Sequence, residues 1–283
     1  MKIALMQMNS VSDKAANIAQ ARDLITRAVD LEEPDWVCLP EHFDWSGGTG
    51  ADKLANADGP KGGPAYDFAQ EIAARHRIWV HAGSFMVKVE SENRIYNTTV
   101  AFNRAGEPVA RYEKIHLFDI TAPGGQVYNE SAIVKPGSRI VTYDCEGLTV
   151  GCAICYDIRF PELFQALAAR GADLIALPAA FTLQTGKDHW EVLSRARAIE
   201  TQCYFAACAQ TGSFKAGGET RFTYGHSLVV DPWGHVVAKA SDGVGFITMR
   251  IDPSLIRKVR GMIPVAAHKV LGQEHAASVE RAA

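Results

Sequence analysis

The chain has 283 residues, 47% hydrophobic and 22% charged, a composition typical of a globular protein with a well-filled core. Its formal net charge is −3, with acids and bases interspersed, which argues against a nucleic-acid-binding stripe or a polybasic membrane patch. We therefore expect a small-molecule or protein partner, with no nucleic acid and no membrane. No signal peptide and no apolar run of about 18 residues is evident, so we expect a cytoplasmic protein.

The first part of the chain alternates predicted strands and helices. Short apolar runs predict strands over 3–9, 36–41 and 78–86. Apolar residues recur at helical spacing over 14–31, and a proline opens a second predicted helix at 64–76. This alternation is typical of a layered α/β domain.

The rest of the chain adds predicted hairpins. One spans 94–114, and a second spans 139–155 with its turn at Glu146 and Gly147. The further predicted elements are a helix over 161–171, a strand over 173–180, a helix from 187 to 202, a strand over 204–210, a hairpin over 226–240 and a strand over 245–251. We expect mixed sheets with helices outside them, in one domain, 1–265, followed by a C-terminal arm, 266–283.

The six cysteines are expected to be reduced in the cytosol, so each is expected either to pack in the core or to take part in the chemistry of a site. Cys152 and Cys155 form a C-x-x-C pair, which raises the possibility of a redox or zinc site. Because LTVGCAIC is predicted to be a strand, residues three apart in it point to opposite faces, and their sulfurs diverge. The chain also offers no second ligand pair at zinc-site spacing, so we expect no metal site.

Three reactive side chains are predicted to lie where apolar strands end. Glu41 closes WVCLPE, Lys114 closes VARYEK and Cys155 closes LTVGCAIC. Catalytic groups in layered α/β proteins collect at such ends. A cysteine nucleophile needs a base, and a tetrahedral intermediate needs a positive group or N–H donors for its oxyanion, to which the backbone N–H of Tyr156 could contribute.

These residues stand in motifs that resemble the nitrilase superfamily of carbon–nitrogen hydrolases. LPEHF, YEKIHLFD and GCAICYDIRFPEL resemble its three signature segments, in the same chain order. Within the superfamily, residues 180–212 and 224–238 look most like the branch of deaminated glutathione amidase and omega-amidase. The resemblance runs from Ile3 to about Val265.

The resemblance implies a role for each of these residues. Cys155 would be the nucleophile, Glu41 the general base and Lys114 the cation that stabilises the oxyanion. Glu130, in QVYNESAIVKPGS, aligns with a further glutamate beside the lysine. The implied fold is a four-layer α-β-β-α sandwich in the α/β class, with two mixed sheets packed face to face, helices outside and frequent homodimers or higher homo-oligomers.

Other candidate site residues have plainer interpretations as well. Arg159 could bind a substrate carboxylate, or could pair with Asp157 or Glu162. Phe181 and Thr185 follow a strand where the family lines its pocket, although an aromatic side chain there is often plain packing.

Two histidines raise the alternative of a Cys–His pair. His116 lies two residues from Lys114, and His189 begins a predicted helix. We favour hydrogen-bonded structural imidazoles for both. No motif for a metal, a dinucleotide or a phosphate is found, so we expect no cofactor.

We therefore expect an amidase that hydrolyses a primary amide or related C–N bond of a small carboxylated substrate through a cysteine thioester, most similar to deaminated glutathione amidase. Alternatives in the superfamily are omega-amidase, N-carbamoyl hydrolase and nitrilase. An alternative from another class is a non-catalytic binding or scaffold protein.

Overall fold

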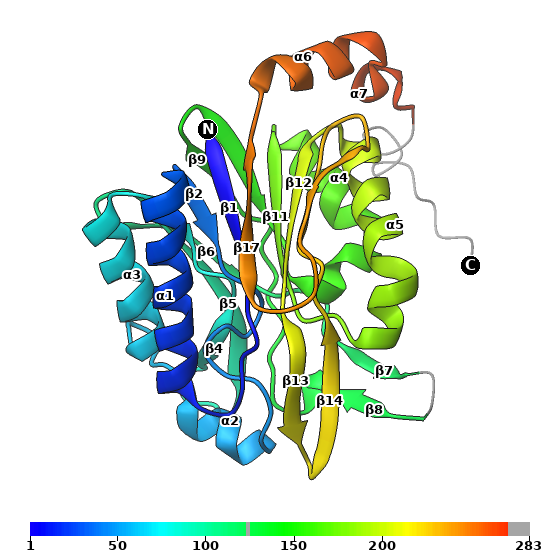
Figure 1. Ribbon diagram of the computed structural model, residues 1–283. Helices are drawn as coiled ribbons and strands as arrows, with labels where there is room; N and C mark the ends of the chain where they lie inside the picture. Colours follow the sequence, from blue (N-terminus) through cyan, green and yellow to red (C-terminus); the bar gives the residue numbers. More distant parts are fainter. Residues whose placement is uncertain (123–124, 271–283) are drawn as a thin grey trace, which may run out of the picture.

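A computed structural model describes residues 1–122 and 125–270. Two β-sheets pack face to face in the middle of the molecule, and helices cover the outer face of each sheet (Figure 1). This is the α-β-β-α sandwich that the sequence resemblance implied. Within the described residues, no helix is both long enough and apolar enough to cross a membrane.

The first sheet has the order β17-β1-β2-β3-β5-β4, with β6 paired to β5. Its strands are β1 (Lys2–Gln7), β2 (Trp36–Cys38), β3 (Trp79–His81), β4 (Phe85–Lys88), β5 (Ile95–Phe102), β6 (Pro108–Glu113) and β17 (Gly245–Arg250). Strands β1, β2 and β3 run parallel, and the others pair antiparallel. The predicted hairpin over 94–114 is formed by β5 and β6.

The second sheet has the order β16-β15-β12-β11-β10-β9. Its strands are β9 (Thr142–Cys145), β10 (Leu148–Cys152), β11 (Leu174–Ala179), β12 (Tyr204–Ala209), β15 (Leu228–Val230) and β16 (Val236–Lys239). The central strands β10, β11 and β12 are parallel, and β11 and β12 are buried along their whole length. Sheets covered on both faces favour such continuous apolar strands.

Helices form the outer layers (Figure 1). The helices α1 (Lys14–Glu32) and α3 (Pro64–His76) cover the first sheet, while α4 (Pro161–Ala169) and α5 (Leu183–Thr201) cover the second. The buried face of α1 includes Ala21, Leu24, Ile25 and Ala28. This 3.6-residue stripe explains why the segment forms an amphipathic helix.

Polar and apolar contacts join the two sheets at the centre. Trp36 on β2 donates its indole N–H to the Tyr143 hydroxyl on β9 at 2.9 Å, although both rings are buried. The Cys208 thiol of β12 lies 3.1 Å from the Met6 carbonyl oxygen and 3.2 Å from that of Cys38. Cys38 and Cys208 therefore fill the core between the sheets, as the sequence allowed.

Three predicted strands differ in extent from the strands of the structure. The strand predicted over 78–86 is interrupted between β3 and β4, where Gly83 turns with φ +47°. The strand predicted over 36–41 ends at Cys38, shortly before Pro40, which has no N–H to donate to a neighbouring strand. The strand predicted to reach Cys155 ends at Cys152.

Several short elements that the sequence did not predict surround one end of the sandwich. They are α2 (Gly50–Asn56), the hairpin of β7 (Asp119–Thr121) and β8 (Val127–Asn129), the 3₁₀ helices η1 (Glu130–Ala132) and η2 (Cys155–Arg159), and the hairpin of β13 (Thr211–Ala216) and β14 (Glu219–Tyr224). Figure 1 shows α2 and both hairpins gathered at the bottom of the molecule.

After β17, a strand of the first sheet, the chain forms α6 (Pro253–Met262) and α7 (Val265–His268) at the opposite end of the sandwich (Figure 1). The predicted domain boundary at 265 and the predicted arm over 266–283 stay predictions. Residues 271–283 of that arm lie outside the described residues.

Candidate active site

The sequence-predicted site residues converge on one cavity of about 440 Å³ at the end of the sandwich that carries α2 and both hairpins. All of them line it: Glu41, Lys114, Glu130, Cys155, Tyr156, Arg159, Phe181 and Thr185. Glu41 follows β2, Lys114 follows β6 and Cys155 follows β10, so strands from both sheets position the reactive groups. The segments that follow the carboxyl ends of these strands thus supply the lining residues.

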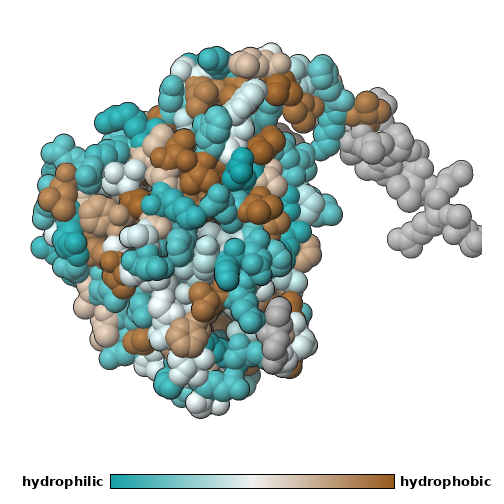
Figure 2. All heavy atoms as spheres, turned by 45° about the vertical axis from the view of Figure 1, so that its right-hand side comes forward, coloured by the Kyte–Doolittle hydropathy of each residue, from teal (hydrophilic) through white to brown (hydrophobic). Residues whose placement is uncertain are grey.

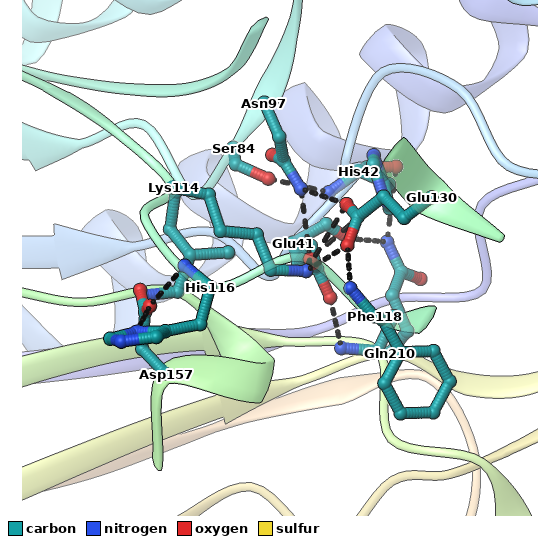
Figure 3. A network of polar contacts seen from close by, with 12 residues as sticks. Glu41, His42, Ser84, Asn97, Lys114, His116, Phe118, Glu130, Asp157 and Gln210 are labelled. Atoms are coloured by element: carbon teal, nitrogen blue, oxygen red, sulfur yellow. Dashed lines mark hydrogen bonds and ion pairs between the residues drawn. The ribbon is translucent and has the colours of Figure 1, made fainter. Parts of the chain in front are cut away.

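The buried ammonium of Lys114 lies between two carboxylates. Its Nζ lies 3.0 Å from Glu41 Oε1 and 2.8 Å from Glu130 Oε2 (Figure 3). The side chain of Lys114 is only 2% exposed. Charge-assisted hydrogen bonds compensate for the burial of this charge and fix its position in the cavity.

The Glu41 carboxylate is held by further hydrogen bonds. Its Oε1 accepts from the Asn97 side-chain amide at 2.9 Å, and its Oε2 accepts from the backbone N–H of Ala180 at 2.9 Å. The backbone carbonyl of Glu41 accepts from the Gln210 side-chain amide at 3.0 Å. Glu41 is therefore oriented by groups from both sheets.

The pKa values of this ion pair favour two charged partners. Burial opposes ionisation of Glu41, but the charges of Lys114 and His42, together with hydrogen bonds from Cys155 and Lys114, lower the pKa of the Glu41 carboxyl below its ordinary value. Burial likewise opposes protonation of Lys114, yet the carboxylates of Glu130 and Glu41 raise its pKa well above the ordinary value. At neutral pH the site therefore holds a carboxylate that can accept a proton and an ammonium that can bind an oxyanion.

Cys155 opens the η2 turn with a positive φ of 48°, a backbone conformation that costs energy in a residue other than glycine. Of the six cysteines, which all lie within the described ranges, Cys155 alone lines the cavity. Burial, and next the Glu41 carboxylate, raise the pKa of its thiol well above the ordinary value, although Lys114 opposes this shift. The resting group is therefore a thiol beside a base.

Asp157 anchors the turn that carries Cys155. Its Oδ2 accepts from the Tyr112 hydroxyl at 2.7 Å and from the Ile154 N–H at 2.9 Å. Its Oδ1 lies 2.7 Å from His116 Nδ1 and accepts from the His116 N–H at 3.0 Å. The His116 ring stacks on Phe160 at 3.7 Å between centroids. These contacts are those of a structural imidazole.

Arg159 pairs with neither Asp157 nor Glu162 among the described residues. Its guanidinium carbon lies 5.5 Å from the Phe181 ring centroid, and its Nη2 lies 3.3 Å from Nδ1 of His189. An aromatic face and an imidazole thus hold this cation at the cavity wall. Thr185 shares a 2.7 Å hydroxyl–hydroxyl hydrogen bond with Thr182.

Several lining residues were missed by the sequence analysis. Asn97 lies inside β5 and donates to both Glu41 and Glu130. Lys53 comes from α2 and Arg221 from β14. A polar residue within an apolar strand, such as Asn97, was a usable signal, whereas Lys53 and Arg221 stand in segments without a recognised motif.

One acid–imidazole group resembles a cation site. Ligand atoms of Glu41, His42 and Glu130 lie within 4.8 Å of one another. The Lys114 ammonium already hydrogen-bonds to both carboxylates of this group. A protein cation therefore meets the electrostatic need that a metal ion would otherwise serve.

Comparison with known sequences gives a consistent family. The family model for carbon–nitrogen hydrolases matches residues 2–261. A deaminated glutathione amidase of Synechocystis sp. is 40% identical over 271 residues, covering 94% of this chain and 97% of that protein. The deaminated glutathione amidase of Homo sapiens is 40% identical over 274 residues, covering 94% of this chain and 81% of the human protein.

Comparison with solved structures agrees. Saccharomyces cerevisiae Nit3, described as a member of branch 10 of the nitrilase superfamily, superimposes with a TM-score of 0.84 at 32% identity, covering 97% of this chain and 96% of the yeast chain. The NitFhit protein of C. elegans has a TM-score of 0.84 at 38% identity, covering 95% of this chain and 65% of the NitFhit chain.

Proposed function

Because this chain belongs to the carbon–nitrogen hydrolase family, we propose that it hydrolyses deaminated glutathione, with Cys155 as nucleophile, Glu41 as base and Lys114 as oxyanion-binding cation. The family makes it a hydrolase of C–N bonds with a small-molecule amide substrate. The observation that carries the assignment of roles is the Lys114 ammonium, held 3.0 Å from Glu41, beside a cavity-lining thiol. The 40% identical relatives support the choice of substrate.

In the first step, the Cys155 thiol gives its proton to Glu41 while the sulfur bonds to the amide carbonyl carbon. The ionised state of Glu41 makes this transfer possible, because a neutral carboxyl would have no lone pair of comparable basicity. The carbonyl oxygen becomes an oxyanion, which the Lys114 ammonium stabilises, with the Tyr156 N–H as a second donor.

The tetrahedral intermediate then collapses. The C–N bond breaks, the departing amine takes the proton from Glu41, and the acyl group stays on Cys155 as a thioester. A water molecule next gives a proton to Glu41 and attacks the thioester carbon. The C–S bond breaks, the carboxylic acid leaves, and the proton returns to the Cys155 sulfur, which restores the starting enzyme.

Glu130 acts in this scheme by positioning Lys114. Its Oε2 accepts hydrogen bonds from Lys114 Nζ at 2.8 Å and from the Phe118 N–H at 2.7 Å. Because Lys114 also hydrogen-bonds to Glu41, the two carboxylates together hold the ammonium in place. Removing this carboxylate would let Lys114 move away from the oxyanion position.

Deaminated glutathione carries an oxo group in place of the glutamyl amine and has a carboxylate at each end. We propose that the amide nearer the 2-oxo acid is cleaved. The products are then a five-carbon 2-oxo diacid and cysteinylglycine. Since this amide is secondary, turnover is detected as a new primary amine, whereas α-ketoglutaramate releases ammonia.

The test is a substrate panel under initial-rate conditions. Deaminated glutathione, α-ketoglutaramate, an N-carbamoyl amine and a simple nitrile are compared at equal concentration. We expect the highest kcat/KM for deaminated glutathione. A higher value for one of the other three would replace the proposed substrate, and inactivity toward all four would contradict the proposal.

We also propose a homodimer, in the cytoplasm. Apolar side chains are exposed along the outer face of α5 and the neighbouring β15–β16 hairpin, namely Val192, Ile199, Trp233 and Val237. Brown, hydrophobic patches interrupt the hydrophilic surface in Figure 2, the view that brings the α5 side of the molecule forward. Clustered exposed apolar side chains favour protein–protein contact, and a second copy offers a matching face.

A further inference from the structure

The cavity holds more positive charge than the reaction needs. Its two carboxylates, Glu41 and Glu130, share Lys114, but Lys53, Arg159 and Arg221 also line it. In the described part of the chain, none of these three additional cations has a carboxylate within ion-pairing distance, 4.0 Å. Unneutralised cations in a concave site favour anionic ligands.

Lys53 and Arg221 form a pair separate from Arg159. Arg159 belongs to the η2 turn that also carries Cys155, whereas Lys53 comes from α2 and Arg221 from β14. Burial lowers the pKa of Lys53, the Glu130 carboxylate opposes this, and the Arg221 charge lowers it further. Both cations line the same cavity, on elements other than the turn that carries Cys155.

Arg221 is held as a ligand-binding guanidinium would be. Its carbon Cζ lies 4.6 Å from the Tyr128 ring centroid. Its Nε is buried, and no residue in the described ranges accepts a hydrogen bond from it. Arg221 therefore has no protein acceptor at Nε among the described residues.

The backbone fixes α2 against the hairpin that carries Arg221. The Gly48 N–H donates to the Lys215 carbonyl oxygen of β13 at 3.0 Å. At Gly47, φ is +94° and a Cβ atom would lie 2.2 Å from that same oxygen, so only glycine permits this approach. The two cations are thus placed on one preformed wall.

We propose that Lys53 and Arg221 form a second anion subsite, which binds the glycine carboxylate of the substrate's leaving group. This inference rests on the proposed function for the identity of the ligand. Arg159, on the nucleophile's own turn, then serves the carboxylate of the shorter acyl part. A substrate with a carboxylate at each end would span both subsites.

The test compares deaminated glutathione with its C-terminal amide, which lacks only the glycine carboxylate. The parent protein is expected to prefer the free carboxylate, in kcat/KM, by about tenfold or more. In Arg221→Gln and in Lys53→Met this ratio should fall toward one. Arg221→Lys should keep part of the preference, because it retains the charge but loses the planar fork.

Two controls use cations of the same region. Arg159→Gln should lower kcat/KM for both compounds and leave their ratio unchanged. Lys215→Gln removes an exposed hairpin cation that hydrogen-bonds to Thr220 and does not line the cavity, so the ratio should again be unchanged. Urea unfolding of each variant identifies any that fail to fold.

An unchanged ratio in both folded variants, Arg221→Gln and Lys53→Met, would overturn the subsite. If the parent does not cleave deaminated glutathione, the proposed function fails. Binding to the Cys155→Ala variant, measured by calorimetry, then tests the subsite independently of turnover. Tighter binding of deaminated glutathione than of its C-terminal amide, lost when Arg221→Gln is added, would support the subsite. Equal affinity for the two compounds, or no binding of either, would overturn it.

Discussion

At the scale of single residues, the site is organised around a cation that two carboxylates share. Lys114 is buried, so its charge is tolerable only because Glu41 and Glu130 both contact it. The same arrangement leaves Glu41 ionised beside a neutral thiol. The charges that stabilise the site are therefore those that the proposed chemistry uses.

Replacing Lys114 by methionine should remove both activity and stability. The substitution leaves the buried Glu41 carboxylate and the partly exposed Glu130 carboxylate without their shared cation, which costs about 3–5 kcal/mol. Urea denaturation measures the free energy of unfolding, and Lys215→Met serves as a matched control at an exposed lysine. A stability equal to that of the parent would show that the buried charges are not coupled.

The pH dependence separates a glutamate base from a histidine base. Glu41 has a lowered pKa, so its stabilising contribution is present above the ordinary glutamate pKa and is lost as pH falls through the folded value. Lys114 has a raised pKa, so its contribution is present below the ordinary lysine pKa and is lost only as pH rises through the folded value. We therefore expect kcat/KM to be flat from about pH 6 to about pH 9. An acid limb near pH 6.5, as for a histidine base, would contradict the assignment.

Site residues could be predicted where they stand in a recognised sequence motif. Glu41, Lys114 and Cys155 follow apolar runs and stand in three family segments. Asn97 was missed because strand patterning alone does not show which buried polar residue faces a cavity. Lys53 and Arg221 were missed because their meeting depends on the approach of α2 to a distant hairpin.

At the scale of elements, the ends of strands and the turns after them place the reactive groups. At Gly83 the backbone packs so closely against the segment before Glu41 that there is no room for a side chain. Its φ is +47°, and a Cβ there would lie 2.2 Å from the Pro40 carbonyl oxygen, next to Glu41. The break between β3 and β4 therefore makes room for the segment that carries the base.

Gly83→Ala should displace this segment, lower kcat and destabilise the fold. Gly147→Ala is the matched control, because Gly147 also has a positive φ, +78°, but a Cβ there meets no atom within 4 Å. The control should lose only about 1 kcal/mol for the left-handed backbone. Equal kcat in the two variants would mean that close packing against Pro40 does not position Glu41.

Element types were largely predictable, but their ends were not. The helix over 64–76 agrees with the structure residue for residue, since Pro64 opens it and its apolar face repeats. The strand before Cys155 is three residues shorter than predicted, because Asp157 draws the chain into a turn through the Ile154 N–H. The β13–β14 hairpin forms a two-stranded sheet of its own, and most of its residues are exposed or half-buried, so hydrophobic alternation gave little signal.

At the scale of the whole molecule, the sandwich joins groups that are distant in the chain. Glu41 follows a strand of the first sheet and Cys155 follows a strand of the second, so the site exists only when the two sheets pack face to face. The alternation of strands and helices predicted layers. Apart from the hairpins, it did not show which strands pair, because strand order depends on contacts far apart in sequence.

The proposed dimer makes a prediction at this scale. Val192→Glu places a charge on the exposed apolar face of α5, where Val192 is 67% exposed. A dimer formed through this face should dissociate, which light scattering measures as a halved mass. Leu31→Glu, at a 70% exposed apolar residue on α1, should leave the mass unchanged. A parent protein that is already monomeric would contradict the dimer.

The central claim is that the Cys155 sulfur forms the bond to the substrate, and turnover by Cys155→Ala tests it most directly. Cys152→Ala is the matched control, because Cys152 is buried in the core and does not line the cavity. We predict that Cys155→Ala lowers kcat for deaminated glutathione by about 10⁴-fold or more with its fold retained, while Cys152→Ala stays active. Turnover by folded Cys155→Ala at the parent rate would contradict the account.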